Sequence, residues 1–120
     1  MSGATESPAD PKLVAVAKTI NDLDDLVRLI LKGLARTKTW QRQLAARLGD
    51  VDRLVQVLRL TIAMEWLDGE ITAAAEAVAV ACRRTAASLA GSRADYPLLQ
   101  AVALVSDLGD KLRAAFKELA

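Results

Sequence analysis

The sequence predicts an all-α protein whose helices pack as an up-down-up-down antiparallel four-helix bundle. Apolar residues recur at steps of three and four along four segments, and the helix-favouring residues Ala, Leu, Arg, Lys and Glu dominate. Aromatic residues, which favour strands, make up only 3% of the chain. A chain of 120 residues, 52% of them hydrophobic, can form one domain with its own core. We expect this domain over residues 11–120, after a flexible polar tail at residues 1–10.

The first helix is expected over residues 11–36, with Asp10 as N-cap and Pro11 in the first turn, where proline is tolerated. Its apolar stripe consists of Leu13, Val16, Ile20, Leu23, Val27, Ile30 and Leu34. Asp24 can form an ion pair with Arg28, four residues further along. Three aspartates lie off the stripe, and we interpret them as a solvated helix face: Asp22, Asp24 and Asp25.

The second helix is expected over residues 39–67. Its apolar stripe consists of Leu44, Leu48, Val51, Val55, Leu58 and Ile62. Gly49 and Asp50 fall inside this segment, but the phase of the stripe continues through them, so we predict one long helix. The alternative is a break at Gly49 with Asp50 as a new N-cap.

The third helix is expected over residues 71–90, after a turn formed by Asp68, Gly69 and Glu70. Nine of its residues are alanine, which predicts a smooth helix that a neighbour can approach closely. We expect larger side chains to overpack the buried positions among Ala74, Ala77, Ala81 and similar residues.

The fourth helix is expected over residues 96–119, with Asp95 as N-cap and Pro97 in the first turn. Its stripe consists of Leu98, Val102, Val105, Leu112, Phe116 and Leu119. The first two expected helices are about 40 Å long and the third about 30 Å, at 1.5 Å per residue. This difference predicts an overhang of apolar surface that a second copy could cover.

The composition argues against several function classes. Histidine is absent, which removes the commonest general base and the commonest metal ligand, and no glycine-rich phosphate loop is present. We therefore expect no enzyme activity, no catalytic residue, no metal site and no cofactor. The single cysteine, Cys82, cannot form an internal disulfide and reads as a small buried core residue. No apolar run is long enough for a transmembrane segment, and we expect a cytoplasmic protein.

A basic and aromatic cluster emerges once the topology is assumed, because the first and third turns of such a bundle share one end. The candidate surface for an anion or a partner consists of Arg36, Lys38, Trp40, Arg42, Arg83, Arg84, Arg93 and Tyr96. The opposite end collects Glu65, Asp68 and Glu70. The cluster predicts contact with phosphate, nucleic acid or anionic lipid. The alternative is structural, since basic residues near helix C-termini are favoured by the helix dipole.

Residues 41–60 offer a second route to nucleic acid. The stretch QRQLAARLG resembles the first helix of the helix-turn-helix pattern of bacterial regulators, whose spacing is matched by Gln41, Ala45, Gly49, Val55 and Leu58. The pattern is lost after the glycine, where Asp50 and Asp52 would stand near DNA phosphates. The recognition helix that it implies is also mostly apolar, whereas base readout needs polar side chains.

A further stretch, residues 19–29 followed by Gly33, is similar to the amphipathic N-terminal helix of the peroxins that elongate the peroxisomal membrane. Asp25 stands where that family usually has a basic residue, and the chain is too short for the rest of the family. No residue role is carried over from this resemblance.

These observations favour a non-enzymatic helical interaction module, either an oligomeric scaffold or an accessory subunit with coiled-coil-like packing. Its expected partner is a second copy, in a homodimer or a larger oligomer, or another helical protein. One alternative is a protein that binds nucleic acid or an anionic surface through the basic end or residues 41–60. A second alternative is a peripheral membrane-associated amphipathic helical protein.

Overall fold

The computed structural model describes residues 11–64 and 68–119, and these form four α-helices without a strand. The helices are α2 (Pro11–Gly33), α3 (Thr39–Ala63), α4 (Asp68–Ser88) and α5 (Tyr96–Leu119). The tail expected at residues 1–10 lies outside the described residues, as do Glu65, Trp66 and Leu67.

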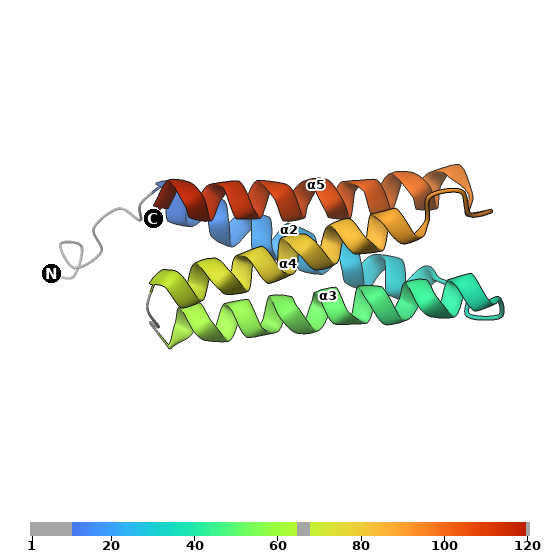
Figure 1. The fold of residues 1–120 in the computed structure, drawn as a ribbon, viewed down its shortest axis with the longest axis horizontal. Helices are drawn as coiled ribbons and strands as arrows, with labels where there is room; N and C mark the ends of the chain where they lie inside the picture. Colours follow the sequence, from blue (N-terminus) through green and yellow to red (C-terminus); the bar gives the residue numbers. More distant parts are fainter. Residues whose placement is uncertain (1–10, 65–67, 120) are drawn as a thin grey trace, which may run out of the picture.

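The four helices run alternately up and down and lie side by side (Figure 1). Each helix packs against the two that neighbour it in a closed ring: α2 on α3, α3 on α4, α4 on α5, and α5 on α2. Short connections between consecutive helices favour this antiparallel arrangement. The predicted four-helix bundle is confirmed.

The core is built from the predicted stripes. The fully buried or nearly buried apolar residues include Val16, Ile20, Leu23, Val27, Ile30, Leu44, Leu48, Val51, Val55, Leu58, Val102, Val105, Leu112 and Phe116. The third helix contributes smaller side chains to the same core: Ala75, Val78, Ala79 and Cys82. Leu13 differs from the prediction, because this first member of the α2 stripe is 54% exposed.

Helix α3 passes through Gly49 without a break, so the alternative of a helix end at this glycine is wrong. Its first turn is held by the Gln41 side chain, whose Oε1 accepts hydrogen bonds from the backbone N–H of Thr37 at 3.1 Å and of Lys38 at 2.9 Å. These bonds satisfy donors that a helix N-terminus leaves without an intrahelical partner.

Several predicted boundaries need correction. Helix α2 ends at Gly33 rather than at residue 36, and α4 begins at Asp68, so Gly69 and Glu70 are helical rather than part of a turn. The described helices contain 23, 25, 21 and 24 residues, which is too similar for the expected overhang. After α4, Gly91 has a φ of 76°, a left-handed conformation that glycine adopts without steric cost.

Helices α4 and α5 approach closely at Gly109. A β-carbon at this position would lie 2.8 Å from Cβ of Cys82 and 3.3 Å from Cα of Ala79. The expected close approach to the alanine-rich helix is therefore present, but its buried alanines are Ala75 and Ala79. The three alanines named in the prediction, Ala74, Ala77 and Ala81, are half-buried.

Candidate functional site

The first and third turns of the bundle lie at the same end, as the topology predicted (Figure 1, right). The chain leaves α2 at Gly33 and enters α3 at Thr39, while residues 89–95 connect α4 to α5. In α5, Asp95 acts as the predicted N-cap, because its Oδ1 accepts a hydrogen bond from the backbone N–H of Leu98 at 3.0 Å.

Two of the predicted arginines at this end bind backbone carbonyls. Arg42 donates from Nη1 to the carbonyl oxygens of Arg36, at 3.2 Å, and Thr37, at 3.0 Å. Arg36 donates from Nη2 to the carbonyl oxygen of Leu31 at 3.4 Å, near the C-terminus of α2. Arg36 thus satisfies a carbonyl in the last turn of α2, which is the structural alternative for this cluster, whereas Arg42 binds the connection between α2 and α3.

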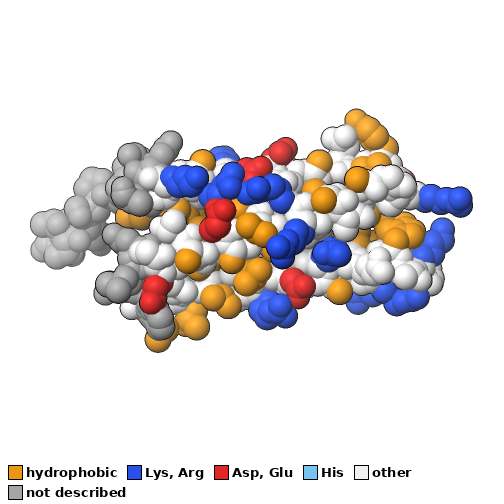
Figure 2. All heavy atoms as spheres, viewed as in Figure 1, with side chains coloured by type: hydrophobic (Ala, Val, Ile, Leu, Met, Phe, Trp, Pro, Cys, Tyr) orange, Lys and Arg blue, Asp and Glu red, His pale blue; other side chains and the backbone are white. Residues whose placement is uncertain are grey.

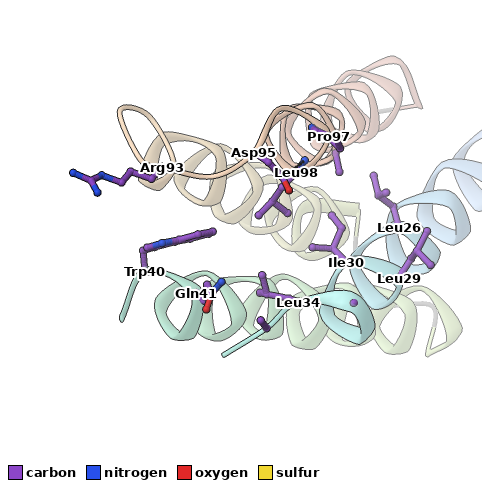
Figure 3. A pocket seen from close by; sticks show the side chains of 13 residues that line it. Leu26, Leu29, Ile30, Leu34, Trp40, Gln41, Arg93, Asp95, Pro97 and Leu98 are labelled. Carbon is purple, nitrogen blue, oxygen red and sulfur yellow. Dashed lines mark hydrogen bonds between the residues drawn. The ribbon is translucent and has the colours of Figure 1, made fainter. Parts of the chain in front are cut away.

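A hollow of about 520 Å³ opens beside this turn, between α2, α5 and the start of α3 (Figure 3). Its lining is Leu26, Leu29, Ile30, Gly33, Leu34, Ala35, Trp40, Gln41, Arg93, Asp95, Pro97, Leu98 and Ala101. The structure therefore brings Trp40 and Arg93, from the first and third turns, to one cavity. Tyr96 is exposed and is not part of this lining.

Arg83 and Arg84 lie within α4, five and four residues before its end at Ser88, and not in the turn that follows. Arg83 lies more than one turn before the end of α4 and forms an ion pair across to α5, with 3.3 Å between its Nε and Oδ1 of Asp110. Arg113 lies on the same seam and forms an ion pair with Glu76 of α4 at 3.5 Å. The eight predicted residues are therefore divided between the end of the bundle and the flank of α4.

The helix-turn-helix interpretation is wrong for residues 41–60, because they lie within the single helix α3. The segment expected to serve as recognition helix also carries core residues: Val51, Val55 and Leu58 are fully buried. A helix fixed in this way cannot enter a DNA major groove with that face.

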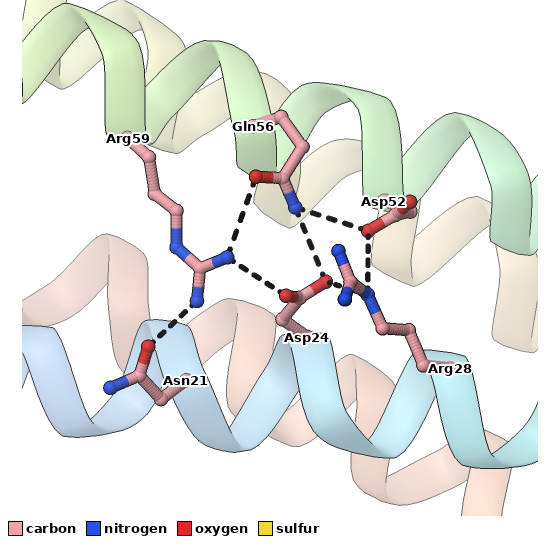
Figure 4. A network of polar contacts seen from close by, with 6 residues as sticks. All are labelled: Asn21, Asp24, Arg28, Asp52, Gln56 and Arg59. Atoms are coloured by element: carbon pink, nitrogen blue, oxygen red, sulfur yellow. Dashed lines mark hydrogen bonds and ion pairs between the residues drawn. The ribbon is translucent and has the colours of Figure 1, made fainter.

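A polar network joins α2 to α3 at mid-bundle (Figure 4). At its centre lies Asp24, which is only 3% exposed, so the interpretation of all three aspartates as a solvated face is wrong for this residue. Arg59 donates from Nη1 to Oδ2 of Asp24 at 2.8 Å and from Nη2 to Oδ1 of Asn21 at 2.7 Å. The predicted pair with Arg28 is also present, with 3.3 Å between its Nε and Oδ1 of Asp24.

Asp52 of α3 enters the same network from the opposite helix. Gln56 donates from Nε2 to one oxygen of each carboxylate, at 3.4 Å to Asp24 and 3.2 Å to Asp52. Arg28 lies 3.7 Å from Oδ1 of Asp52. Arg28 and the amide of Gln56 thus bridge the two carboxylates, and Arg59 binds Asp24 from α3, an arrangement suited to joining two helices.

The two carboxyl groups titrate differently. Burial tends to raise the pKa of Asp24, but hydrogen bonds with Asp52 and Arg59 and the charge of Arg28 outweigh burial, so this pKa lies below its usual value. The pKa of Asp52 is raised, because its carboxyl shares a hydrogen bond with Asp24 and because it is partly buried. Asp52 is therefore the member of the pair that is protonated first as pH falls.

Cys82 is buried between α4 and α5, as predicted for a core residue. Burial, together with the nearby charge of Asp110, raises the pKa of its thiol to about 12. The thiolate that a nucleophilic or metal-binding cysteine needs is therefore scarce at neutral pH. Within residues 11–64 and 68–119, no three Cys, Asp or Glu side chains come together as a metal site would require.

The outward surface of α3 carries an apolar stripe that is separate from the core. Val57, Leu60 and Met64 follow one another at steps of three and four and are 47%, 60% and 57% exposed. Figure 2 shows apolar side chains over the C-terminal half of α3 and Lys or Arg side chains over its N-terminal half. We call these three residues the outer stripe. The spacing of these three residues is visible in the sequence, but the prediction for this helix named only its core stripe.

No family model, curated protein or solved structure matches this chain. No helix in the described part of the chain is both long enough and apolar enough to cross a membrane.

Proposed function

We propose that this protein is a non-enzymatic helical interaction module that forms an antiparallel homodimer through the outer stripe of α3. The observation that carries the proposal is the row of three large, half-exposed apolar side chains, Val57, Leu60 and Met64, on one helix face. Exposed apolar rows at this spacing are typical of helix–helix contacts, since steps of three and four bring side chains to one seam.

The charges beside the stripe favour a second copy of the chain as the partner. Arg53 is exposed about two turns before Leu60 on the same face of α3, where it forms an ion pair with Asp50 at 2.8 Å, whereas Glu70 is exposed near the start of α4. In an antiparallel pair with Leu60 near the two-fold axis, Val57 of one copy faces Met64 of the other. Arg53 of each copy then approaches the start of α4 of the other copy, where Glu70 is exposed, so the face is complementary to itself.

The oligomeric state tests the proposal. Sedimentation equilibrium over a range of protein concentrations should show a monomer–dimer equilibrium. Leu60→Glu places two like charges near the two-fold axis and should leave only monomer. The matched control is Leu104→Glu on α5, where Leu104 is 48% exposed and lies outside the stripe, so this variant should dimerise like the parent.

Two results would refute the dimer. The parent protein could remain monomeric at the highest soluble concentration, or Leu60→Glu could dimerise as well as Leu104→Glu. Far-ultraviolet circular dichroism of both variants checks that the helices are intact, since both substitutions fall on exposed positions.

A further inference from the structure

The hollow at the end of the bundle has an aliphatic floor. Ile30 is buried, and Leu26, Leu34, Leu98 and Ala101 are half-buried around it. Gly33, which also lines the hollow, leaves room for a larger side chain, since a β-carbon there would meet no atom within 4 Å. A volume of about 520 Å³ is within the range of roughly 300–1,000 Å³ typical of small-molecule sites.

The rim of the hollow carries one cationic side chain, Arg93, and one carboxylate, Asp95. Arg93 forms no ion pair among the described residues, and Figure 3 shows its stem at the rim with the guanidinium directed away from the apolar side chains. Arg36 and Arg42 are next in sequence to the lining residues Ala35 and Gln41, and neither forms an ion pair among the described residues. The one carboxylate of the lining, Asp95, is engaged as the N-cap of α5. The hollow thus combines an apolar interior with an arginine at its edge, Arg93, that has no ion-pair partner among the described residues.

We propose that this hollow binds a single monomeric amphiphile that has a hydrocarbon tail and an anionic carboxylate head. The tail lies among the leucines and Ile30, where it is removed from water, and the head lies at the rim. Arg93 has a long, exposed side chain that can turn toward a carboxylate and bind it with two parallel N–H groups. The site is independent of the proposed dimer, because the outer stripe lies toward the opposite end of α3.

Fluorescence of Trp40 tests the proposal directly, since Trp40 lines the hollow. The chain has two tryptophans, so Trp66→Phe leaves Trp40 as the sole reporter. Titration with monomeric dodecanoate should give a saturable change with one site per chain. The uncharged analogue 1-dodecanol should bind about fivefold more weakly, because it lacks the ion pair with the rim.

Two matched pairs of variants, in the Trp66→Phe background, locate the site. Arg93→Gln should remove the preference for dodecanoate over dodecanol, whereas Lys111→Gln, an exposed cation elsewhere on α5, should keep it. Gly33→Leu adds a large side chain at a residue of the lining, where a β-carbon meets no atom within 4 Å, and should weaken dodecanoate binding at least tenfold. Gly49→Leu also meets open space, but lies on α3 away from the lining, and should bind like the parent.

Three outcomes would overturn the proposal. Dodecanoate and dodecanol could bind equally well, which would leave the charge of the head without a role. Gly33→Leu, with its helical spectrum intact, could bind dodecanoate like the parent. Trp40 could also respond only to vesicles of phosphatidylcholine and phosphatidylglycerol and not to dodecanoate, which would mark a membrane-surface contact instead of a single-molecule site.

Discussion

Asp24 shows how strongly one residue can depend on a helix that lies far from it in sequence. Its carboxylate is buried, and two of its partners, Gln56 and Arg59, come from α3. Removing one partner of a buried ion pair leaves the other charge uncompensated, which costs more than an exposed pair ever contributes.

The first prediction concerns this carboxylate. Asp24→Asn should lower the free energy of unfolding by about 1–3 kcal/mol at pH 7, because Arg59 loses a charged acceptor at 2.8 Å. The control is Asp22→Asn on the same helix, which breaks only the exposed pair with Lys18 and should cost less than about 0.5 kcal/mol. Urea unfolding monitored by circular dichroism measures both.

The pH dependence of the Asp24→Asn effect follows from the direction of the pKa shift. A carboxyl whose pKa is lowered by folding stabilises the protein above its unfolded-state pKa of about 3.9. That contribution is lost as pH falls through the lower, folded-state value. The difference between parent and Asp24→Asn should therefore shrink below about pH 4. An equal difference at pH 3 and pH 7 would show that the carboxylate charge is not involved.

Asp52 should behave in the opposite sense, which gives a second prediction. Folding raises the pKa of Asp52, so ionisation of its carboxyl disfavours the folded state. The contribution of the protonated carboxyl to stability is therefore present at low pH and is lost as pH rises through the raised pKa. Asp52→Asn removes the repulsion with Asp24 and should leave stability unchanged or raise it by up to about 1 kcal/mol at pH 7. A loss greater than about 1 kcal/mol in the same urea assay would contradict this reading of the pair.

At the scale of the helix, two glycines in similar helical settings should respond oppositely to the same change. Gly49→Ala meets no neighbour within 4 Å and should stabilise the protein by about 0.5–1 kcal/mol, through helix propensity alone. Gly109→Ala gains the same propensity, but its β-carbon collides with Cys82 and the backbone of Ala79. It should destabilise by about 1–3 kcal/mol overall.

Thermal unfolding of the two variants beside the parent checks the pair of predictions. A rise in melting temperature for Gly109→Ala would show that α4 and α5 can separate without cost. A fall for Gly49→Ala would show that α3 is not a regular helix at this residue.

The helices themselves were predictable because their stripes repeat over many turns, as in Val51, Val55 and Leu58 of α3, all fully buried. The ends of the helices were less predictable, because the apolar spacing does not show where a turn begins. For example, α4 includes Gly69, which the sequence alone marks as the end of a helix. The role of Asp24 was also hidden. Asp22, Asp24 and Asp25 are alike in sequence, and only the position of α3 decides which of them is buried.

The basic end was predicted in part for the same reason. Connectivity alone brings residues 36–42 and 93 together, and the structure agrees (Figure 1). Connectivity does not give the rotation of α4, however, and this rotation places Arg83 against Asp110 rather than at the end. The hollow beside Trp40 was not predictable either, because it depends on how the ends of three helices are placed relative to one another.

For the whole molecule, the proposed dimer makes a prediction about charge. Glu70→Arg and Arg53→Glu should each weaken dimerisation about threefold, since each opposes a like charge across the two-fold axis. The double variant exchanges the two signs and should recover most of the parent affinity. Sedimentation equilibrium at low ionic strength measures the effect, and raised salt should reduce it. Additive weakening in the double variant would mean that these residues do not face each other.

The network around Asp24 also has a consequence for alignment. The apolar members of α2 are similar in size and repeat evenly, so packing alone would discriminate weakly against sliding α2 along α3 by one turn, about 5.4 Å. Such a slide would move Asp24 away from Arg59 and Gln56 and bring an aliphatic residue, Ile20 or Val27, to the arginine. A buried charge without its partner destabilises the folded state, whereas a leucine or valine can pack against many different neighbours. We therefore infer that the carboxylate of Asp24 fixes the register of α2 against α3, selecting a single alignment from several that the hydrophobic core would tolerate.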